Sequence, residues 1–134
     1  MCNKIAVYGT LRYGGPANGF LEGAKYLGKD TIPAYLYHLG WYPGIKLVDD
    51  PTKSDAATVV DVYELPKGEI VDYLKTMDRY EGYSPGHPEE SLFARKKILL
   101  NSNNEEVFVY EYCYDVNDAD LIDDGDWFSA SKVS

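Results

Sequence analysis

The sequence contains little cysteine and no long hydrophobic run. The two cysteines, Cys2 and Cys113, are too few for a disulfide framework or a cysteine-based zinc site. No stretch approaches the roughly 18 apolar residues that a membrane-spanning helix requires. The apolar run near the N-terminus is also too short for the core of a secretory signal peptide. We therefore expect a cytoplasmic protein with no membrane partner.

Basic residues are also scarce. The chain has 13 Lys and Arg residues against 22 Asp and Glu residues, a net charge of −9. Nucleic acids and anionic membranes bind clustered Lys and Arg side chains, so neither is expected as the main partner. Residues 115–126 hold six aspartates and no basic residue. We interpret this acidic C-terminal segment as solvated, although a basic protein partner for it remains an alternative.

The residues that are present describe one ordinary globular domain. The chain has 134 residues, of which 45% are hydrophobic and 26% charged. This composition can build a single hydrophobic core and is unlike that of disordered chains. No repeat or linker interrupts it, so we predict one domain over residues 1–134. Tyrosine is frequent, with 13 residues.

The pattern of apolar residues predicts mostly strands and one clear helix. The helix is expected to begin at Pro66 and to end near Tyr80, before Gly82. Its apolar stripe consists of Ile70, Leu74 and Met77, widened by Val71. The strand predictions, with a bend at Pro33, cover residues 4–8, 25–39, 45–48, 57–65, 92–100 and 105–114. The sum indicates an α+β domain or a small β-barrel.

Two short segments carry candidate chemistry. Residues 7–12 read as a strand that enters a glycine turn and a loop, and such a turn can direct several backbone N–H groups toward an anion or a developing oxyanion. Residues 78–83 place a carboxylate, Glu81, among tyrosines at the end of the predicted helix. Taken singly, each segment is better explained as ordinary structure: a common turn in the first case and a solvated glutamate near a helix end in the second.

Taken together and in this order, the segments resemble the γ-glutamylcyclotransferase-like family, also called the AIG2-like family. The resemblance extends from about Val7 to Trp127. Its specificity lies in the order and spacing of short motifs rather than in any one of them. These motifs are Tyr8-Gly9-Thr10-Leu11, Tyr42-Pro43, Glu81-Gly82-Tyr83, Phe93-Ala94-Arg95 and Gly125-Asp126-Trp127.

The resemblance implies a small mixed β-barrel with flanking helices and a cavity at one end. It implies that Glu81 accepts a proton and that Phe93 stands where some relatives carry a tyrosine. The residues it implies as substrate-binding are Tyr8, Gly9, Thr10 and Leu11, with Arg12, Tyr83 and Tyr112 as further candidates for the pocket wall.

The implied reaction is intramolecular aminolysis of a small-molecule γ-glutamyl amide, which releases 5-oxoproline and an amine or amino acid. This reaction requires no metal and no organic cofactor. A non-catalytic binding or regulatory module on the same fold is the alternative. The identity of the leaving amine and the oligomeric state stay open at the level of sequence.

Overall fold

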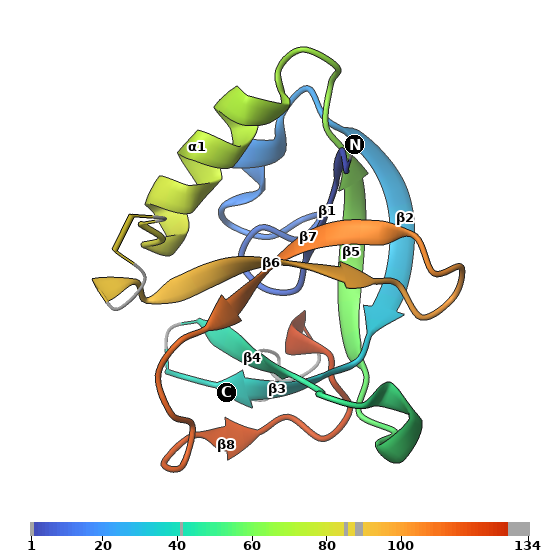
Figure 1. The fold of residues 1–134 in the computed structure, drawn as a ribbon, viewed down its shortest axis with the longest axis vertical. Coiled ribbons are helices and arrows are strands. Elements are labelled where there is room, and N and C mark those ends of the chain that lie inside the picture. The colour runs from blue at the N-terminus through green and yellow to red at the C-terminus, as the bar shows by residue number, and fades with distance from the viewer. Residues whose placement is uncertain (1, 41, 85, 88–89, 129–134) are drawn as a thin grey trace.

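The strands form two sheets in a computed structural model that describes residues 2–40, 42–84, 86–87 and 90–128 (Figure 1). The larger sheet has the strand order β2-β5-β1-β7-β6, and the smaller one has the order β4-β3-β8. The strands of the larger sheet are β1 (Lys4–Val7), β2 (Lys25–Ile32), β5 (Thr58–Glu64), β6 (Phe93–Leu99) and β7 (Glu106–Tyr112). Those of the smaller sheet are β3 (Ala34–His38), β4 (Pro43–Leu47) and β8 (Asp120–Leu121).

The helices are few and short. The α-helix α1 spans Ile70–Glu81. Two 3₁₀ turns, Asn18–Leu21 and Pro51–Lys53, lie in connections between strands. The predicted mixed α+β class is confirmed. The strands that were expected to build a small barrel are arranged in the two sheets described above.

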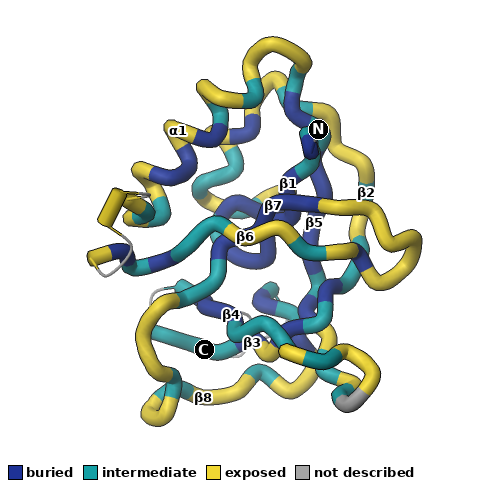
Figure 2. Tube along the Cα trace, in the orientation of Figure 1, coloured by how far each residue is buried: buried dark blue, intermediate teal, exposed yellow. Residues whose placement is uncertain are grey.

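Side chains alternate between the two faces of the five-stranded sheet and fill a separate core on each. On β1, Ile5 and Val7 join the core that α1 covers, whereas Ala6 lies in the core shared with the smaller sheet. On β7, Phe108 lies on the α1 side and Val109 on the other. The central strands β1 and β7 are buried and β8 is exposed (Figure 2).

The predicted strands agree with the structure to within a few residues, and the helix differs at its start. Pro33 separates β2 from β3, as expected. The helix begins at Ile70 rather than at Pro66, because Gly68 takes a left-handed conformation with φ +83° and interrupts the helical path. Val71 was expected to widen the buried stripe, but it is 63% exposed.

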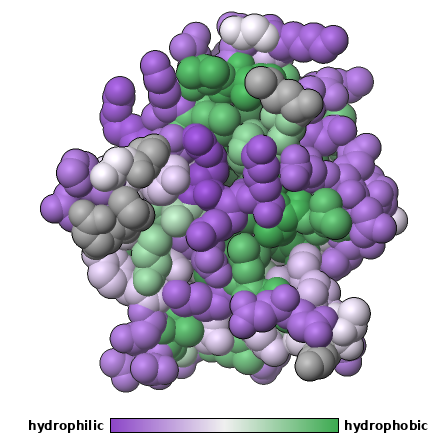
Figure 3. Space-filling model, in the orientation of Figure 1, coloured by the Kyte–Doolittle hydropathy of each residue, from purple (hydrophilic) through white to green (hydrophobic). Residues whose placement is uncertain are grey.

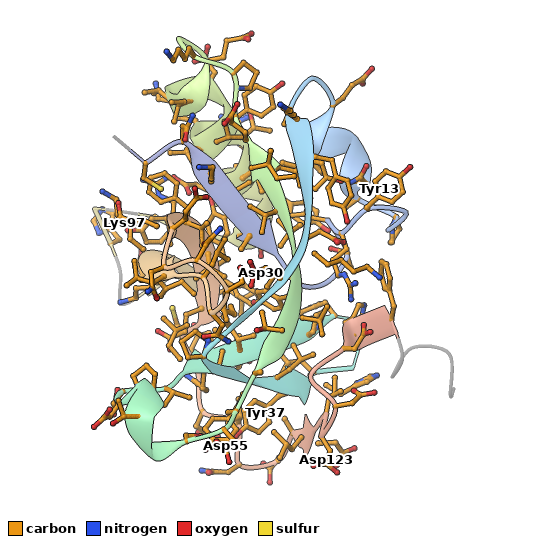
Figure 4. The ribbon with its side chains drawn as sticks, turned by 90° about the vertical axis from the view of Figure 1, so that its right-hand side faces the viewer. Tyr13, Asp30, Tyr37, Asp55, Lys97 and Asp123 are labelled. Carbon is orange, nitrogen blue, oxygen red and sulfur yellow. The ribbon has the colours of Figure 1, made fainter. Side chains whose placement is uncertain are left out.

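The acidic C-terminal segment is solvated only in part. Tyr37 and Asp123 lie at the end of the molecule formed by the smaller sheet (Figure 4). Further along the segment, the Val59 N–H donates to the Gly125 carbonyl at 2.7 Å, and Trp127 is buried in the core between the sheets. The end of the described chain is therefore part of the folded body.

Polar side chains cover much of the face seen in Figure 3, with apolar groups visible between them. Within the described residues, no helix has the length and apolar character needed to cross a membrane.

Candidate active site

The loop after β1 is held in a tight turn. The Arg12 N–H donates to the Gly9 carbonyl at 3.0 Å, which reverses the chain. The buried hydroxyl of Tyr8 donates to the Tyr110 carbonyl at 2.7 Å and fixes the start of the loop against β7. Gly9 is required by its neighbour, since a Cβ at this position would lie 2.5 Å from Cγ of Pro43.

This turn presents three backbone donors. The N–H groups of Gly9, Thr10 and Leu11 form no hydrogen bond within the described part of the chain. Successive N–H groups of this kind can together stabilise a negatively charged oxygen. The described fold therefore leaves these three donors unused beside the cavity-lining residues of the same loop.

Glu81 is the last residue of α1. Met77 and Asp78 precede it by four and three positions on the buried side of the helix, which sets the face on which Glu81 lies. The helix ends immediately afterwards, because Gly82 adopts φ +69°. The Tyr83 N–H then donates to the Asp78 carbonyl at 2.8 Å, the pattern of a Schellman C-cap.

The loop and the helix end meet around a cavity of about 210 Å³. Its buried lining comes from the end of β1 and the following loop, and from β4, β6 and β7. Tyr80, which is 42% exposed, marks the mouth. The Thr10 and Tyr80 hydroxyls are hydrogen-bonded there at 2.9 Å. The lining residues are Ala6, Val7, Tyr8, Gly9, Thr10, Leu11, Tyr42, Pro43, Tyr80, Glu81, Leu92, Phe93 and Tyr110.

Among the described residues of this lining, only Glu81 carries a carboxylate, an amine or an imidazole. Burial raises the pKa of its carboxyl group to about 7. Burial also raises the pKa of the Tyr8 hydroxyl well above its ordinary value, and the nearby Glu81 charge raises it further. The cavity thus combines a proton acceptor poised near neutral pH with a neutral phenol.

Asp78, three residues before Glu81 on α1, binds two further polar side chains. Nη1 of Arg95 donates to both carboxylate oxygens of Asp78, at 2.8 and 2.7 Å, and the Tyr110 hydroxyl donates to the same carboxylate at 2.5 Å. Burial and the Asp78 carboxylate together raise the pKa of Tyr110. Asp78 therefore pairs with the charge of Arg95, and burial is the dominant influence on the pKa of Glu81.

The structure brings most of the predicted site residues together. Glu81 and the four residues of the loop, Tyr8 to Leu11, all line the cavity. Arg12, Tyr83 and Tyr112 do not line it. Arg12 is buried in ion pairs behind the loop. Tyr83 lies beside Arg95, and the Tyr112 ring packs against Phe93 with the ring centres 5.4 Å apart.

Sequence reasoning assigned no role to several residues that shape the site. Tyr110 could have been found from its place on the β7 face that carries Phe108, and Asp78 from its position one helical turn before Glu81. The contacts of Tyr80 with Thr10 have no local sequence signal, because 70 residues separate them. Among the described residues no group of three or more His, Cys, Asp or Glu side chains is arranged to hold a metal ion.

The fold and the site define a small α+β protein with one carboxylate in a cavity beside a turn of free N–H groups. The family model for gamma-glutamyl cyclotransferase, AIG2-like proteins matches residues 5–129, so the chain belongs to this family.

Two relatives and one solved structure illustrate the similarity. A protein of Pyrococcus horikoshii named "putative gamma-glutamylcyclotransferase" is 36% identical over 80 residues, which are 60% of this chain and 63% of that protein. A Vibrio cholerae protein with the same description is 28% identical over 129 residues, 95% of this chain and 96% of that one. The crystal structure of an uncharacterized P. horikoshii protein has a TM-score of 0.71 at 23% identity, covering 97% of this chain and 93% of that one.

Proposed function

We propose that this protein is an enzyme that cyclises a γ-glutamyl amide, releasing 5-oxoproline and an amine or amino acid. The observation that carries the proposal is the meeting of Glu81 and the loop of free N–H groups at one cavity. Membership of the gamma-glutamyl cyclotransferase, AIG2-like family supports the same class of reaction.

The proposed reaction needs a base. The α-amine nitrogen of the substrate attacks its own γ-carbonyl carbon, forming a C–N bond and placing negative charge on the carbonyl oxygen. When the carbonyl re-forms, the bond to the leaving nitrogen breaks. Glu81 accepts the proton that the attacking nitrogen loses and delivers it to the departing amine. A pKa of about 7 suits both steps, because an ordinary carboxylate is a much weaker base.

The tetrahedral intermediate carries an oxyanion. The N–H groups of Gly9, Thr10 and Leu11 are the donors proposed to stabilise it, since they have no other acceptor in the described structure. Loss of a single donor of this kind in an enzyme lowers the rate by about 10²- to 10³-fold.

The remaining task of the cavity is to fold the substrate. Both reacting groups belong to one molecule, and well-oriented intramolecular reactions reach effective molarities of about 10⁵ M or more. Aromatic and aliphatic walls, including Tyr42, Leu92 and Phe93, enclose the space in which the γ-glutamyl unit would bend. No step of this scheme uses a metal or an organic cofactor.

The experiment is a panel of γ-glutamyl amino acids, γ-glutamyl-lysine, glutathione and simple γ-glutamyl amines, scored for 5-oxoproline. The wild-type protein should release 5-oxoproline from at least one of them, and Glu81→Gln should abolish most of that release while keeping the fold. Glu81→Gln protein that works at the wild-type rate would refute the role of Glu81. Stabilisation of the wild-type protein by these compounds without turnover would instead support a non-catalytic binding module.

A further inference from the structure

Arg12 is among the most buried residues of the molecule although it carries a full charge. Only 1% of its surface is exposed. Its Nε donates to Oδ2 of Asp61 at 3.0 Å, and its Nη1 donates to Oδ1 of Asp126 at 2.6 Å. The guanidinium also lies 4.2 Å from the centre of the Phe128 ring. Two different nitrogens thus hold carboxylates from two distant parts of the chain.

Asp61 anchors more than Arg12. It lies on β5 and is itself only 1% exposed. Its Oδ2 also accepts the Tyr13 N–H at 3.0 Å, and its Oδ1 accepts the Tyr26 hydroxyl at 2.9 Å. Arg12, the last residue of the donor turn, and Tyr13, which follows it, are therefore fixed to the same strand.

The main chain of Arg12 belongs to the turn that carries the free donors. Its N–H donates to the Gly9 carbonyl at 3.0 Å, and its carbonyl accepts the Gly15 N–H at 2.7 Å. Along the chain, the three free N–H groups consequently lie between β1 and Arg12, whose side chain is bound to Asp61 of β5. A shift of the Arg12 main chain would therefore disturb the turn that its N–H closes.

Asp126 brings the C-terminal segment into the same arrangement. Its own N-terminal neighbour, Gly125, adopts φ +68° so closely against the Ala57 carbonyl that no Cβ would fit there. The Asp126 carboxylate also accepts the Phe128 N–H at 3.0 Å. The carboxylate is thereby aimed at Arg12 by local structure that a solvated segment would lack.

We propose that Arg12 is a positioning residue of the site, which fixes the oxyanion-binding turn through Asp61, and that Asp126 acts as a C-terminal clamp on it. This proposal rests on the proposed function. In this scheme Arg12 does not contact the substrate, because its guanidinium is paired with the carboxylates of Asp61 and Asp126. The acidic segment contributes to catalysis through one aspartate without lining the cavity.

Asp126→Asn is the main test, since it removes the charge and keeps the size. A displaced donor turn weakens binding of the transition state more than binding of the substrate. We expect kcat for 5-oxoproline release to fall by about 10- to 100-fold, with KM changed by less than about threefold. Asp126→Glu, which restores the carboxylate, should recover part of the loss. Arg12→Lys should resemble Asp126→Asn, because one ammonium group cannot replace two guanidinium nitrogens.

The control separates positioning from stability. Leu100 is buried in the core between the sheets, outside the cavity lining, and Leu100→Ala should lower Tm with kcat retained. Unchanged kcat in Asp126→Asn overturns the proposal. It is also overturned if Leu100→Ala, with a Tm as low as that of Asp126→Asn, loses as much kcat as Asp126→Asn does. If the wild-type protein releases no 5-oxoproline from any substrate of the panel, the proposed function fails and the catalytic role of Arg12 falls with it. An active wild type with a fully active Asp126→Asn refutes the positioning role alone.

Discussion

Glu81 is a carboxyl group held where its charge is disfavoured. Desolvation raises its pKa from 4.5 to about 7, and no cation lines the cavity among the described residues. The neighbouring Arg95 is engaged by Asp78 rather than by Glu81. In the proposed reaction this placement gives a stronger base, at a cost in folding stability.

The cost predicts a pH dependence of stability. The folded state binds more protons than the unfolded state between pH 4.5 and about 7, so the contribution of Glu81 is fully favourable below pH 4.5 and is lost as the pH rises through 7. We expect Glu81→Gln to be more stable than the wild type at pH 8, by up to about 3 kcal/mol, and similar to it at pH 4.

Urea unfolding at the two pH values measures this difference. The control is Glu22→Gln, which changes an exposed glutamate outside the cavity. Equal stability of Glu81→Gln and wild type at pH 8 would contradict the burial of the Glu81 charge.

At the residue scale the sequence predicted the carboxylate that lines the cavity but not its surroundings. The order of the motifs singled out Glu81 and the four loop residues, all of which line the cavity. It also proposed Arg12 as a pocket residue, whereas the structure buries Arg12 between Asp61 and Asp126. Charged partners 49 and 114 positions away leave no periodic signal in one sequence.

The loop after β1 depends on contact between two elements. Pro43, at the start of β4, occupies the space into which a side chain at Gly9 would project. Gly9→Ala should therefore displace the donor turn, lower stability by about 1–3 kcal/mol and reduce activity.

The double variant Gly9→Ala/Pro43→Ala provides the rescue, because it removes the Cγ that lies 2.5 Å from the added methyl group. Thermal melts and 5-oxoproline release should both recover in part. A Gly9→Ala protein with wild-type stability and activity would show that the close approach does not constrain the loop.

The end of α1 is the second element that positions the site. Gly82 has φ +69°, so Gly82→Ala strains the C-cap and should cost about 1 kcal/mol. Because Glu81 immediately precedes this residue, activity should fall by more than the loss of stability explains.

Gly68→Ala is the matched control. Gly68 also has a positive φ, +83°, but it lies before the helix with open space around it. It should lose similar stability and keep its activity. Equal activities of the two variants would show that the C-cap at Gly82 does not position Glu81.

Elements were predictable where local chemistry decides them. Pro33 and Gly82 marked boundaries correctly, because proline and left-handed glycine act through their own backbone. The same effect at Gly68 was overlooked, which placed the start of the helix four residues early. The exposure of Val71 depends on tertiary packing, and periodicity alone did not exclude it from the buried stripe.

At the scale of the whole molecule, the C-terminal segment links the surface to the site. Trp127 is 8% exposed and packs in the core between the two sheets, with His38 beside its ring. Trp127→Ala should destabilise the protein by about 3–5 kcal/mol. Tyr114→Ala, at a half-exposed position, should cost far less, and equal losses would show that the segment does not close the core.

The net charge of −9 does not show how the charged residues are distributed in the fold. Most aspartates of residues 115–126 are exposed, as predicted for a solvated segment. Asp126 differs, because the fold brings it to a buried arginine that precedes it by 114 residues. Total charge excludes classes of partner but does not locate an ion pair.

The most direct test of the central claim is the pH dependence of kcat/KM for 5-oxoproline release. If Glu81 is the base, kcat/KM should rise with pH through an inflection near 7, where burial places the pKa of its carboxyl group, and then level off. Glu81→Gln should remove that inflection together with most of the activity. A wild-type profile that is flat from pH 5 to pH 8, or an inflection that persists in Glu81→Gln, would contradict the account.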